Sequence, residues 1–269
     1  MAGEEFDRLL LKIRPVCCGP LLKRRTRLVL QAIRDARGSS LAARLAELDA
    51  TIDVIEQAWS RLLRGLWWSG LRIEESLNLT WGQPDTIRID TSGRFVMLRI
   101  NAANEKGHRD RLYPVSPEFA DMILAVPEDQ RTGHFFQALG TRGGVVRYHA
   151  VCKSICAIGK QANVVVSHDG GKTKHASAHD LRRSFGLRWS ERVMPAQLRE
   201  LMRHESIETT MTYYVGRNAE ATAAALYESV GRKPNKPASG DTFGDTSRNA
   251  DSENEESLTQ PIAASGFKE

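Results

Sequence analysis

The chain has 269 residues, of which 41% are hydrophobic and 26% charged, and its formal net charge at pH 7 is +5. This composition is typical of a globular protein with a sizeable core, and it excludes fibrous and wholly disordered chains. No run of about 18 apolar residues is present, and the N-terminus is acidic at Glu4, Glu5 and Asp7. We therefore expect neither a membrane span nor a signal peptide, and we expect a cytoplasmic protein.

Charge is unevenly distributed along the chain. Residues 231–269 contain seven acidic and five basic residues among many Pro, Gly, Ser and Asn, which predicts a disordered acidic tail after a last helix over 219–227. The basic excess lies in residues 1–230 and favours an anionic partner, with nucleic acid as the first candidate. No metal site is expected, because the four cysteines lack zinc-ligand spacing. We expect buried, reduced thiols at Cys17, Cys18, Cys152 and Cys156.

Helical patterns fill the first 70 residues. Apolar spacing predicts helices over 4–14, 21–36 and 41–69, with a break at 17–20 and some interruption of the third helix. The second helix carries a basic run that is either a solvated face or a set of contacts to backbone phosphates. That run consists of Lys23, Arg24, Arg25 and Arg27.

A turn at Ser69 and Gly70 separates the long helix from a new one that begins at Arg72. The apolar period then changes to two, and three segments predict a small three-stranded antiparallel sheet over residues 86–115. Lys106 lies in the turn between the second and third strands. The fold expected from the whole pattern is α+β and mainly α-helical.

Two further helices are predicted over 117–125 and 146–162. A basic, glycine-rich loop over 167–175 follows, and it contains Lys172 and Lys174. The loop lacks the G-x-x-x-x-G-K-[ST] spacing of a P-loop, so no nucleoside triphosphate site is expected.

Side chains able to bind and attack a phosphate are concentrated in residues 175–214. An apolar stripe at i, i+3, i+7 and i+11 begins at Ala178 and predicts a helix with one buried face. His179 and Arg182 are three residues apart, so they share another face of this helix and can converge on one ligand. A second, short helix is predicted just before His204.

A third helix is predicted to begin after Ser206, which is a suitable N-cap. Ile207, Met211 and Tyr214 are expected to form its buried stripe. On that phase Tyr213 is turned about 100° from the stripe. Tyr213 is therefore expected to be the exposed and reactive tyrosine of the pair.

The segments HDLRRSF, which starts at His179, and LMRHESIETTMTYY, which contains His204, resemble the C-terminal boxes of the tyrosine recombinases, the phage integrase family. That family has His-x-x-Arg and then a tyrosine nine residues beyond a second histidine, and this spacing selects Tyr213. The resemblance covers roughly residues 54–230. Arg203 departs from the family pattern, in which glycine is commonest before the second histidine, and we expect the change to be tolerated.

The resemblance implies roles for particular residues. Arg72 followed by Glu75 is similar to the first box of the family, in which the arginine is catalytic and the acid would orient it. The catalytic lysine of the family corresponds to Lys106. The implied catalytic set is Arg72, Lys106, His179, Arg182, His204 and Tyr213. Further contacts to DNA are expected from Arg183, Lys172 and Lys174.

By this resemblance the chain is a site-specific recombinase or integrase of a mobile element, which cuts and rejoins DNA through a 3′-phosphotyrosyl intermediate. Two guanidiniums can each offer paired donors to the non-bridging oxygens. Tyr213 would attack as a phenolate, His179 would assist its deprotonation, His204 would donate to the phosphate, and Lys106 would protonate the leaving 5′-oxygen. No metal, ATP or other cofactor is implied. The implied partners are double-stranded DNA, at the nucleoid, and further copies of the chain in a tetramer on DNA, with no membrane.

Residues 1–230 are expected to form the catalytic domain, with the N-terminal core-binding domain of the family absent or on another chain, since only 71 residues precede Arg72. The alternative function is therefore a non-catalytic or clamp-less DNA-binding remnant, although the intact catalytic set argues against it. A type IB topoisomerase would use similar chemistry. It usually has Lys at the place of His179, so it ranks last.

Overall fold

The computed structural model describes residues 1–35, 41–83, 86–100, 111–214, 229 and 231. The chain divides into two units, Met1–Ala219 and Glu220–Glu269, and the helices and strands named below belong to the first. Lys106, the helix expected over 219–227 and residues 232–269 of the tail lie outside the described residues.

The N-terminal helices follow the sequence pattern closely. They are α1 (Gly3–Leu11), α2 (Ile13–Cys17), α3 (Gly19–Asp35) and α4 (Leu41–Ser69). The break expected over 17–20 is shorter than predicted, because Pro20 stands in the first turn of α3, where its missing N–H is tolerated. The interruption expected in the third helix is wrong, since α4 is one continuous helix of 29 residues.

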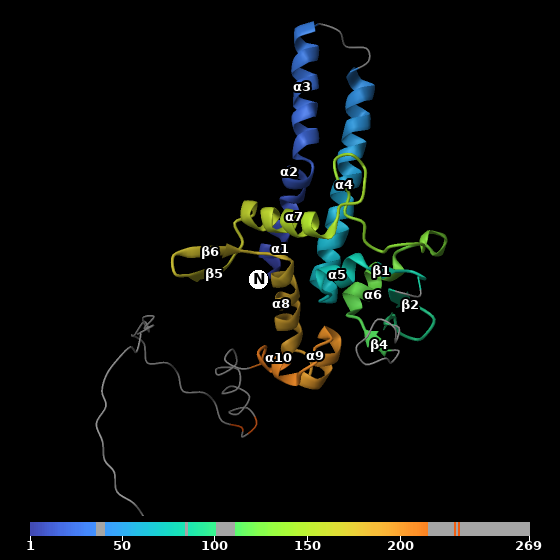
Figure 1. Cartoon of the computed structure of the whole chain (residues 1–269), viewed down its shortest axis with the longest axis vertical. Coiled ribbons are helices and arrows are strands. Elements are labelled where there is room, and N and C mark those ends of the chain that lie inside the picture. The colour runs from blue at the N-terminus through green and yellow to red at the C-terminus, as the bar shows by residue number, and fades with distance from the viewer. Residues whose placement is uncertain (36–40, 84–85, 101–110, 215–228, 230, 232–269) are drawn as a thin grey trace, which may run out of the picture. The chain divides into compact units, whose positions relative to one another are not determined.

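Helices α3 and α4 lie side by side (Figure 1). One residue of the basic run joins them, because the Arg25 guanidinium donates to the Asp49 carboxylate at 2.7 Å. Arg14 of α2 likewise donates to Glu56 of α4 at 2.9 Å. The basic run is thus in part an ion-paired helix face, while Lys23 and Arg27 remain exposed.

The predicted antiparallel sheet is confirmed, with one addition. Strands β2 (Ile87–Asp90), β3 (Met97–Ile100) and β4 (Arg111–Pro114) pair antiparallel, and β1 (Leu79–Thr80) pairs parallel with β2. The sequence did not predict β1 because two residues are too few to show a period of two.

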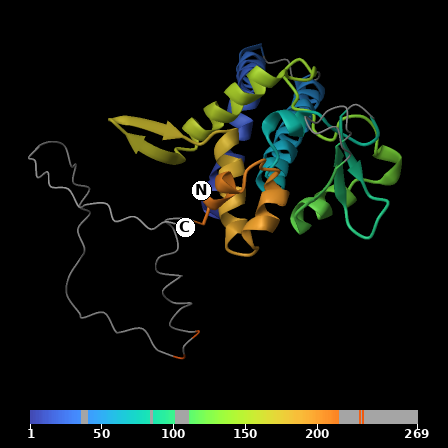
Figure 2. The ribbon, with the colours of Figure 1, turned by 60° about the horizontal axis from the view of Figure 1, so that its bottom comes forward.

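The loop expected over 167–175 is instead a β-hairpin. Strands β5 (Val165–Asp169) and β6 (Lys172–His175) pair antiparallel around Gly170 and Gly171, whose φ values are +51° and +77°. Two central residues with positive φ are what a tight hairpin turn requires, so the paired glycines were a turn signal. The hairpin extends away from α7 and α8 in both ribbon views (Figures 1 and 2).

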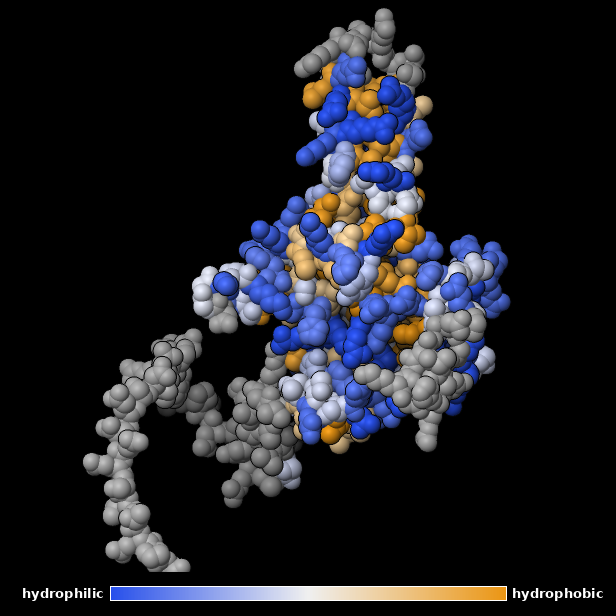
Figure 3. All heavy atoms as spheres, in the orientation of Figure 1, coloured by the Kyte–Doolittle hydropathy of each residue, from blue (hydrophilic) through white to orange (hydrophobic). Residues whose placement is uncertain are grey.

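The remaining described helices follow Arg72 in the chain. They are α5 (Ile73–Leu77), α6 (Pro117–Leu124), α7 (Tyr148–Gln161), α8 (Ala178–Ser190), α9 (Pro195–Met202) and α10 (Ile207–Met211), with a short 3-10 helix at Glu128–Gln130. Helix α8 packs on α4 and α9, and α9 packs on α10. Where α5 and α8 approach each other in the view of Figure 3, the surface is mostly hydrophilic.

Arg188 attaches α8 to α4. Its guanidinium lies 3.5 Å from the centre of the Trp67 ring and donates to the Trp67 carbonyl oxygen. On its other side Trp67 stacks on Phe6 of α1, with ring centroids 4.5 Å apart. Burial lowers the pKa of Arg188 to about 10, which leaves it charged at neutral pH. The helix that carries His179 and Arg182 is thereby fixed to α4, the longest of the described helices.

The cysteines are only partly as expected. Cys18 is buried, but Cys156 is exposed because it follows the buried Ile155 by one position, about 100° around α7. In the described part of the chain, no three His, Cys, Asp or Glu side chains are grouped so that they could hold a metal ion. None of the helices described is long and apolar enough to cross a membrane.

We predict that Gly159→Ala destabilises the fold by about 2 kcal/mol or more. A β-carbon at this position of α7 would lie 2.0 Å from the carbonyl oxygen of Ala176. Relief of this clash would require the backbone of α7 or of Ala176 to move, because the contact involves no flexible side chain. The measurement is urea unfolding against Gly19→Ala, a helical glycine with open space around it, which should be neutral or slightly stabilising. Equal unfolding midpoints for the two variants would contradict the packing of α7 on the segment before α8.

Candidate active site

The turn after α4 positions Arg72. Gly70 has a φ of +59°, and a β-carbon there would lie 2.3 Å from the ring of Phe185, so the turn requires glycine. Arg72 is then the N-cap of α5. Its backbone N–H donates to Glu75 Oε2 at 2.7 Å and its Nη1 donates to Glu75 Oε1 at 2.9 Å. Glu75 therefore fixes both the start of the helix and the direction of the Arg72 side chain.

Arg182 projects from the middle of α8 and its side chain is only 5% exposed. Its Nη1 donates to the carbonyl of Gly70, and its Nη2 donates to the carbonyl of Met202 at the end of α9. The Glu75 carboxylate lies 3.9 Å away. Burial, followed by the nearby Arg203 and Arg72, lowers the pKa of Arg182 to about 9, so it remains charged at neutral pH. A guanidinium has five N–H donors, and these two bonds leave others for an anion.

His204 and Tyr213 lie next to each other on the α9–α10 side of the site. Their rings are nearly parallel, at 17°, with centroids 6.0 Å apart. His204 Nδ1 is hydrogen-bonded to the buried hydroxyl of Thr210 at 2.9 Å, which fixes the orientation of the imidazole ring. Either atom can be the donor, depending on the histidine tautomer.

The buried stripe predicted for the third helix is wrong. Ile207 and Met211 are 38% and 36% exposed, and the fully buried residue of α10 is Thr210. The helix ends at Met211, so a helical phase does not extend to the tyrosines. The hydroxyl of Tyr214 donates to the carbonyl of Val193 at 2.7 Å, whereas Tyr213 faces a cavity. Tyr213 is half-buried rather than exposed.

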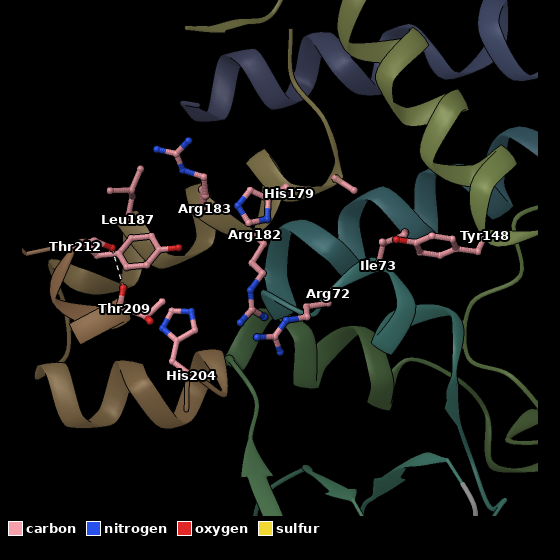
Figure 4. Close-up of a pocket in the computed structure, with 12 residues that line it drawn as sticks. Arg72, Ile73, Tyr148, His179, Arg182, Arg183, Leu187, His204, Thr209 and Thr212 are labelled. Carbon is pink, nitrogen blue, oxygen red and sulfur yellow. Dashed lines mark hydrogen bonds between the residues drawn. The ribbon is translucent and has the colours of Figure 1, made fainter. Parts of the chain in front are cut away.

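That cavity, which we call the α8 cavity, has a volume of about 580 Å³. The predicted site residues that line it are Arg72, His179, Arg182, Arg183, His204 and Tyr213. Figure 4 shows the side chains of Arg72 and Arg182 close together, with His204 beside them and His179 on the opposite side of Arg182. Side chains from α5, α8 and the α9–α10 region thus meet in one basic hollow.

Other predicted residues lie elsewhere. Lys172 and Lys174 are exposed on β6, and Lys174 forms an ion pair with Asp180 at 3.1 Å. Asp180 also accepts from the backbone N–H of Ser177 at 3.0 Å, so this carboxylate both caps α8 and holds the hairpin. Contacts of these lysines to DNA stay a prediction.

The arginines dominate the electrostatics of the site. Burial alone would raise the pKa of Glu75, but Arg203, the backbone N–H of Arg72 and the Arg182 and Arg72 guanidiniums lower it to about 2. Burial and then the same arginines lower the pKa of His204 to about 4, and burial lowers the pKa of His179. Burial raises the pKa of Tyr213, against the opposing effect of Arg182 and Arg183. With its pKa raised above the ordinary value, the Tyr213 phenol is protonated at neutral pH.

Several residues of the site had no clear signal in the sequence. Tyr148 lines the α8 cavity from the start of α7, together with Ile73, Ala178, Leu187, Thr209 and Thr212. No local pattern distinguishes Tyr148 from a surface tyrosine, since its place depends on how α7 packs. Arg203 did have a signal, because it stands where the family pattern has glycine.

We predict that the His204 imidazole stays neutral from pH 7 down to about pH 5 and titrates near pH 4. An unfolded chain would protonate this ring near pH 6.5, so the folded protein holds fewer protons between those values and loses stability as the pH falls through that window. The measurement is an NMR titration of the histidine signals, with His204→Asn used to assign the resonance. A midpoint at or above pH 6.5 would contradict the burial of this imidazole beside the three arginines.

The chain has similarities to known recombinases. The phage integrase family model matches residues 41–220. The tyrosine recombinase XerD of Lacticaseibacillus casei is 24% identical over 216 residues, which cover 79% of this chain and 69% of that protein. The Tn1549 transposon integrase in complex with transposon right end DNA has a TM-score of 0.45 at 18% identity and 75% coverage of each chain. The XerA recombinase has a TM-score of 0.41 at 16% identity, covering 86% of this chain and 100% of that one. Because the family match spans more than half of the residues, this chain belongs to the phage integrase family.

Proposed function

We propose that this protein is a site-specific recombinase that cuts and rejoins double-stranded DNA through a covalent bond between Tyr213 and a 3′-phosphate. The observation that carries the proposal is the convergence of Arg72, His179, Arg182, His204 and Tyr213 on the α8 cavity. Membership of the phage integrase family and the likeness to the tyrosine recombinase XerD support it.

The cavity suits a phosphodiester because the transition state of its cleavage gathers negative charge on the non-bridging oxygens. Arg72 and Arg182 both lie within 4 Å of one carboxylate, so their guanidiniums are close enough to bind a single phosphate. Both keep N–H donors for paired bonds to it. A bound phosphate would also provide a second anionic partner for Arg72 and Arg182, beside Glu75.

The remaining roles follow from position. Tyr213 attacks phosphorus, and the field of Arg182 and Arg183 opposes the effect of burial on its phenol. His179, at the first turn of α8, assists removal of the phenolic proton, and His204 donates to a non-bridging oxygen from the ring nitrogen that is not bonded to Thr210. Lys106 is proposed as the acid that protonates the leaving 5′-oxygen. Residues 1–230 would act as the catalytic domain, at the nucleoid and in a tetramer on DNA.

A non-catalytic DNA-binding protein is the alternative function. It would need the same basic surface but not the tyrosine beside His204. The stacked arrangement of His204 and Tyr213, with a buried threonine holding the histidine, favours the enzyme.

We predict that Tyr213→Phe abolishes covalent attachment to a nicked suicide DNA substrate while DNA binding and folding are kept. Tyr214→Phe is the matched control, because it removes only a hydrogen bond to the Val193 carbonyl and should cost about 1 kcal/mol of stability. The adduct is scored as a shifted band on a denaturing gel. Loss of the adduct in Tyr214→Phe and its retention in Tyr213→Phe would overturn the assignment, and absence of any adduct in the wild-type protein would favour the alternative function.

Gly186→Ala should slow adduct formation at least tenfold with the protein still folded. A β-carbon on this α8 residue would lie 2.5 Å from Cε1 of the Tyr213 ring and 2.6 Å from Sδ of Met202, so the tyrosine must move. Gly19→Ala, which meets nothing within 4 Å, serves as the control. An unchanged rate in the Gly186 variant would mean that the nucleophile does not depend on this contact.

A further inference from the structure

Arg203 has an unusual backbone and an unusual environment. It ends α9 in the left-handed conformation, with φ of +53° and ψ of +46°, which favours glycine and costs energy for a residue with a β-carbon. Its side chain is nevertheless only 5% exposed. Its Nε is buried with no hydrogen-bond partner among the described residues. Backbone strain and an unsatisfied buried donor both oppose stability, so stability alone does not explain an arginine here.

The Arg203 guanidinium is directed at Glu75. Its Nη2 donates to Glu75 Oε2 at 3.0 Å and to the carbonyl of Gly70 at 3.2 Å, and its Nη1 donates to the carbonyl of Leu201 at 3.1 Å. Arg72 binds the other carboxylate oxygen, Oε1, at 2.9 Å. Each oxygen of the carboxylate thus has its own guanidinium partner.

Arg182 lies outside this pairing. Its Nη1 is 3.9 Å from Glu75 Oε2, farther than either of the other two guanidiniums, and it is bonded to the Gly70 carbonyl that Arg203 also contacts. If Arg203 were absent, Oε2 would lose its guanidinium partner, and the Arg182 Nη1 already lies 3.9 Å from that oxygen. The carboxylate would then draw Arg182 towards itself and away from the cavity.

We propose that Arg203 is a positioning residue, which neutralises Glu75 so that Arg182 stays available to the scissile phosphate. This inference rests on the proposed function. It extends the site beyond the six residues that the sequence identified, through a side chain that does not line the α8 cavity. The three guanidiniums of Arg72, Arg182 and Arg203 face the single carboxylate of Glu75, which leaves two positive charges in excess.

Two excess charges matter more to the transition state than to the bound substrate. A phosphodiester carries one negative charge, and further charge develops on its oxygens as the tyrosine attacks. Removing one charge should therefore reduce the rate of cleavage more than the affinity for DNA.

The test compares Arg203→Met, which keeps the length of the side chain without its charge, with the wild-type protein on a nicked suicide duplex. We expect DNA affinity to change by less than about threefold and the rate of adduct formation to fall at least tenfold. Arg203→Gly, which relieves the left-handed strain, should be at least as stable as Arg203→Met and equally slow. Arg203→Lys should recover part of the rate, since it keeps the charge but not the planar set of donors.

The decisive variant is Arg203→Met combined with Glu75→Gln. Once the carboxylate charge is removed, Arg182 is no longer drawn to it, so the double variant should be faster than Arg203→Met alone. Wild-type rates in both Arg203→Met and Arg203→Gly would overturn the proposal. A double variant slower than Arg203→Met alone or Glu75→Gln alone would overturn it as well.

A separate measurement distinguishes this proposal from the proposed function. Urea unfolding tests the Arg203–Glu75 pair without any DNA. It compares the wild type with Arg203→Met, Glu75→Gln and the double variant. The double variant should lose less stability than the sum of the single losses. A wild-type protein that forms no adduct would overturn the proposed function, and strictly additive losses of stability would overturn the pairing itself.

Discussion

The site is built around one buried charge. The Arg182 guanidinium lies inside the protein and must find acceptors there, since an unpaired buried charge is very costly. It finds them in the carbonyls of Gly70 and Met202, which are 112 and 20 residues away in the sequence. The turn that carries Arg72 and the end of α9 that leads to His204 are thereby held against α8. These two hydrogen bonds from one guanidinium help to position Arg72, Arg182 and His204.

Bringing several arginines together creates a repulsion that the fold has to offset. The Glu75 carboxylate lies within 4 Å of the Arg72, Arg182 and Arg203 guanidiniums. It remains ionised because these arginines lower its pKa to about 2. Burial, aided by the same arginines, keeps His204 neutral, and Arg182 and Arg183 oppose the effect of burial on Tyr213. The protein thus holds the protonated Tyr213, the proposed nucleophile, beside a cavity whose arginines favour an anion. An incoming phosphate would be bound first and would then meet a tyrosine already in place.

Close contacts to glycine fix the remaining geometry. Gly70 lets the Phe185 ring approach the turn before Arg72, and Gly186 lets the Tyr213 ring lie directly on α8. Side chains that approach this closely have little freedom to shift, and phosphoryl transfer depends on rigid placement of the reacting groups as well as on charge stabilisation. The close approach at Gly186 thus sets where the Tyr213 ring lies, and the one at Gly70 sets the turn before Arg72.

The sequence alone determined the mainly helical α+β class, the long helices and the antiparallel β2–β3–β4 unit, because periodicity is a local property. By motif spacing, the sequence also selected five residues that meet at the α8 cavity, whereas Lys106 lies outside the described residues. It misplaced the stripe of α10, since a five-residue helix that ends at Met211 cannot carry a phase to the tyrosines. The sequence pattern predicted a loop over 167–175, where the structure has the β5–β6 hairpin, although Gly170 and Gly171 indicated the turn. Only the tertiary structure decided that Tyr148 reaches the cavity, that Thr210 holds His204 and that Arg203 pairs with Glu75. Those contacts join segments whose approach depends on how α4, α7, α8 and α9 pack, and no local pattern encodes it.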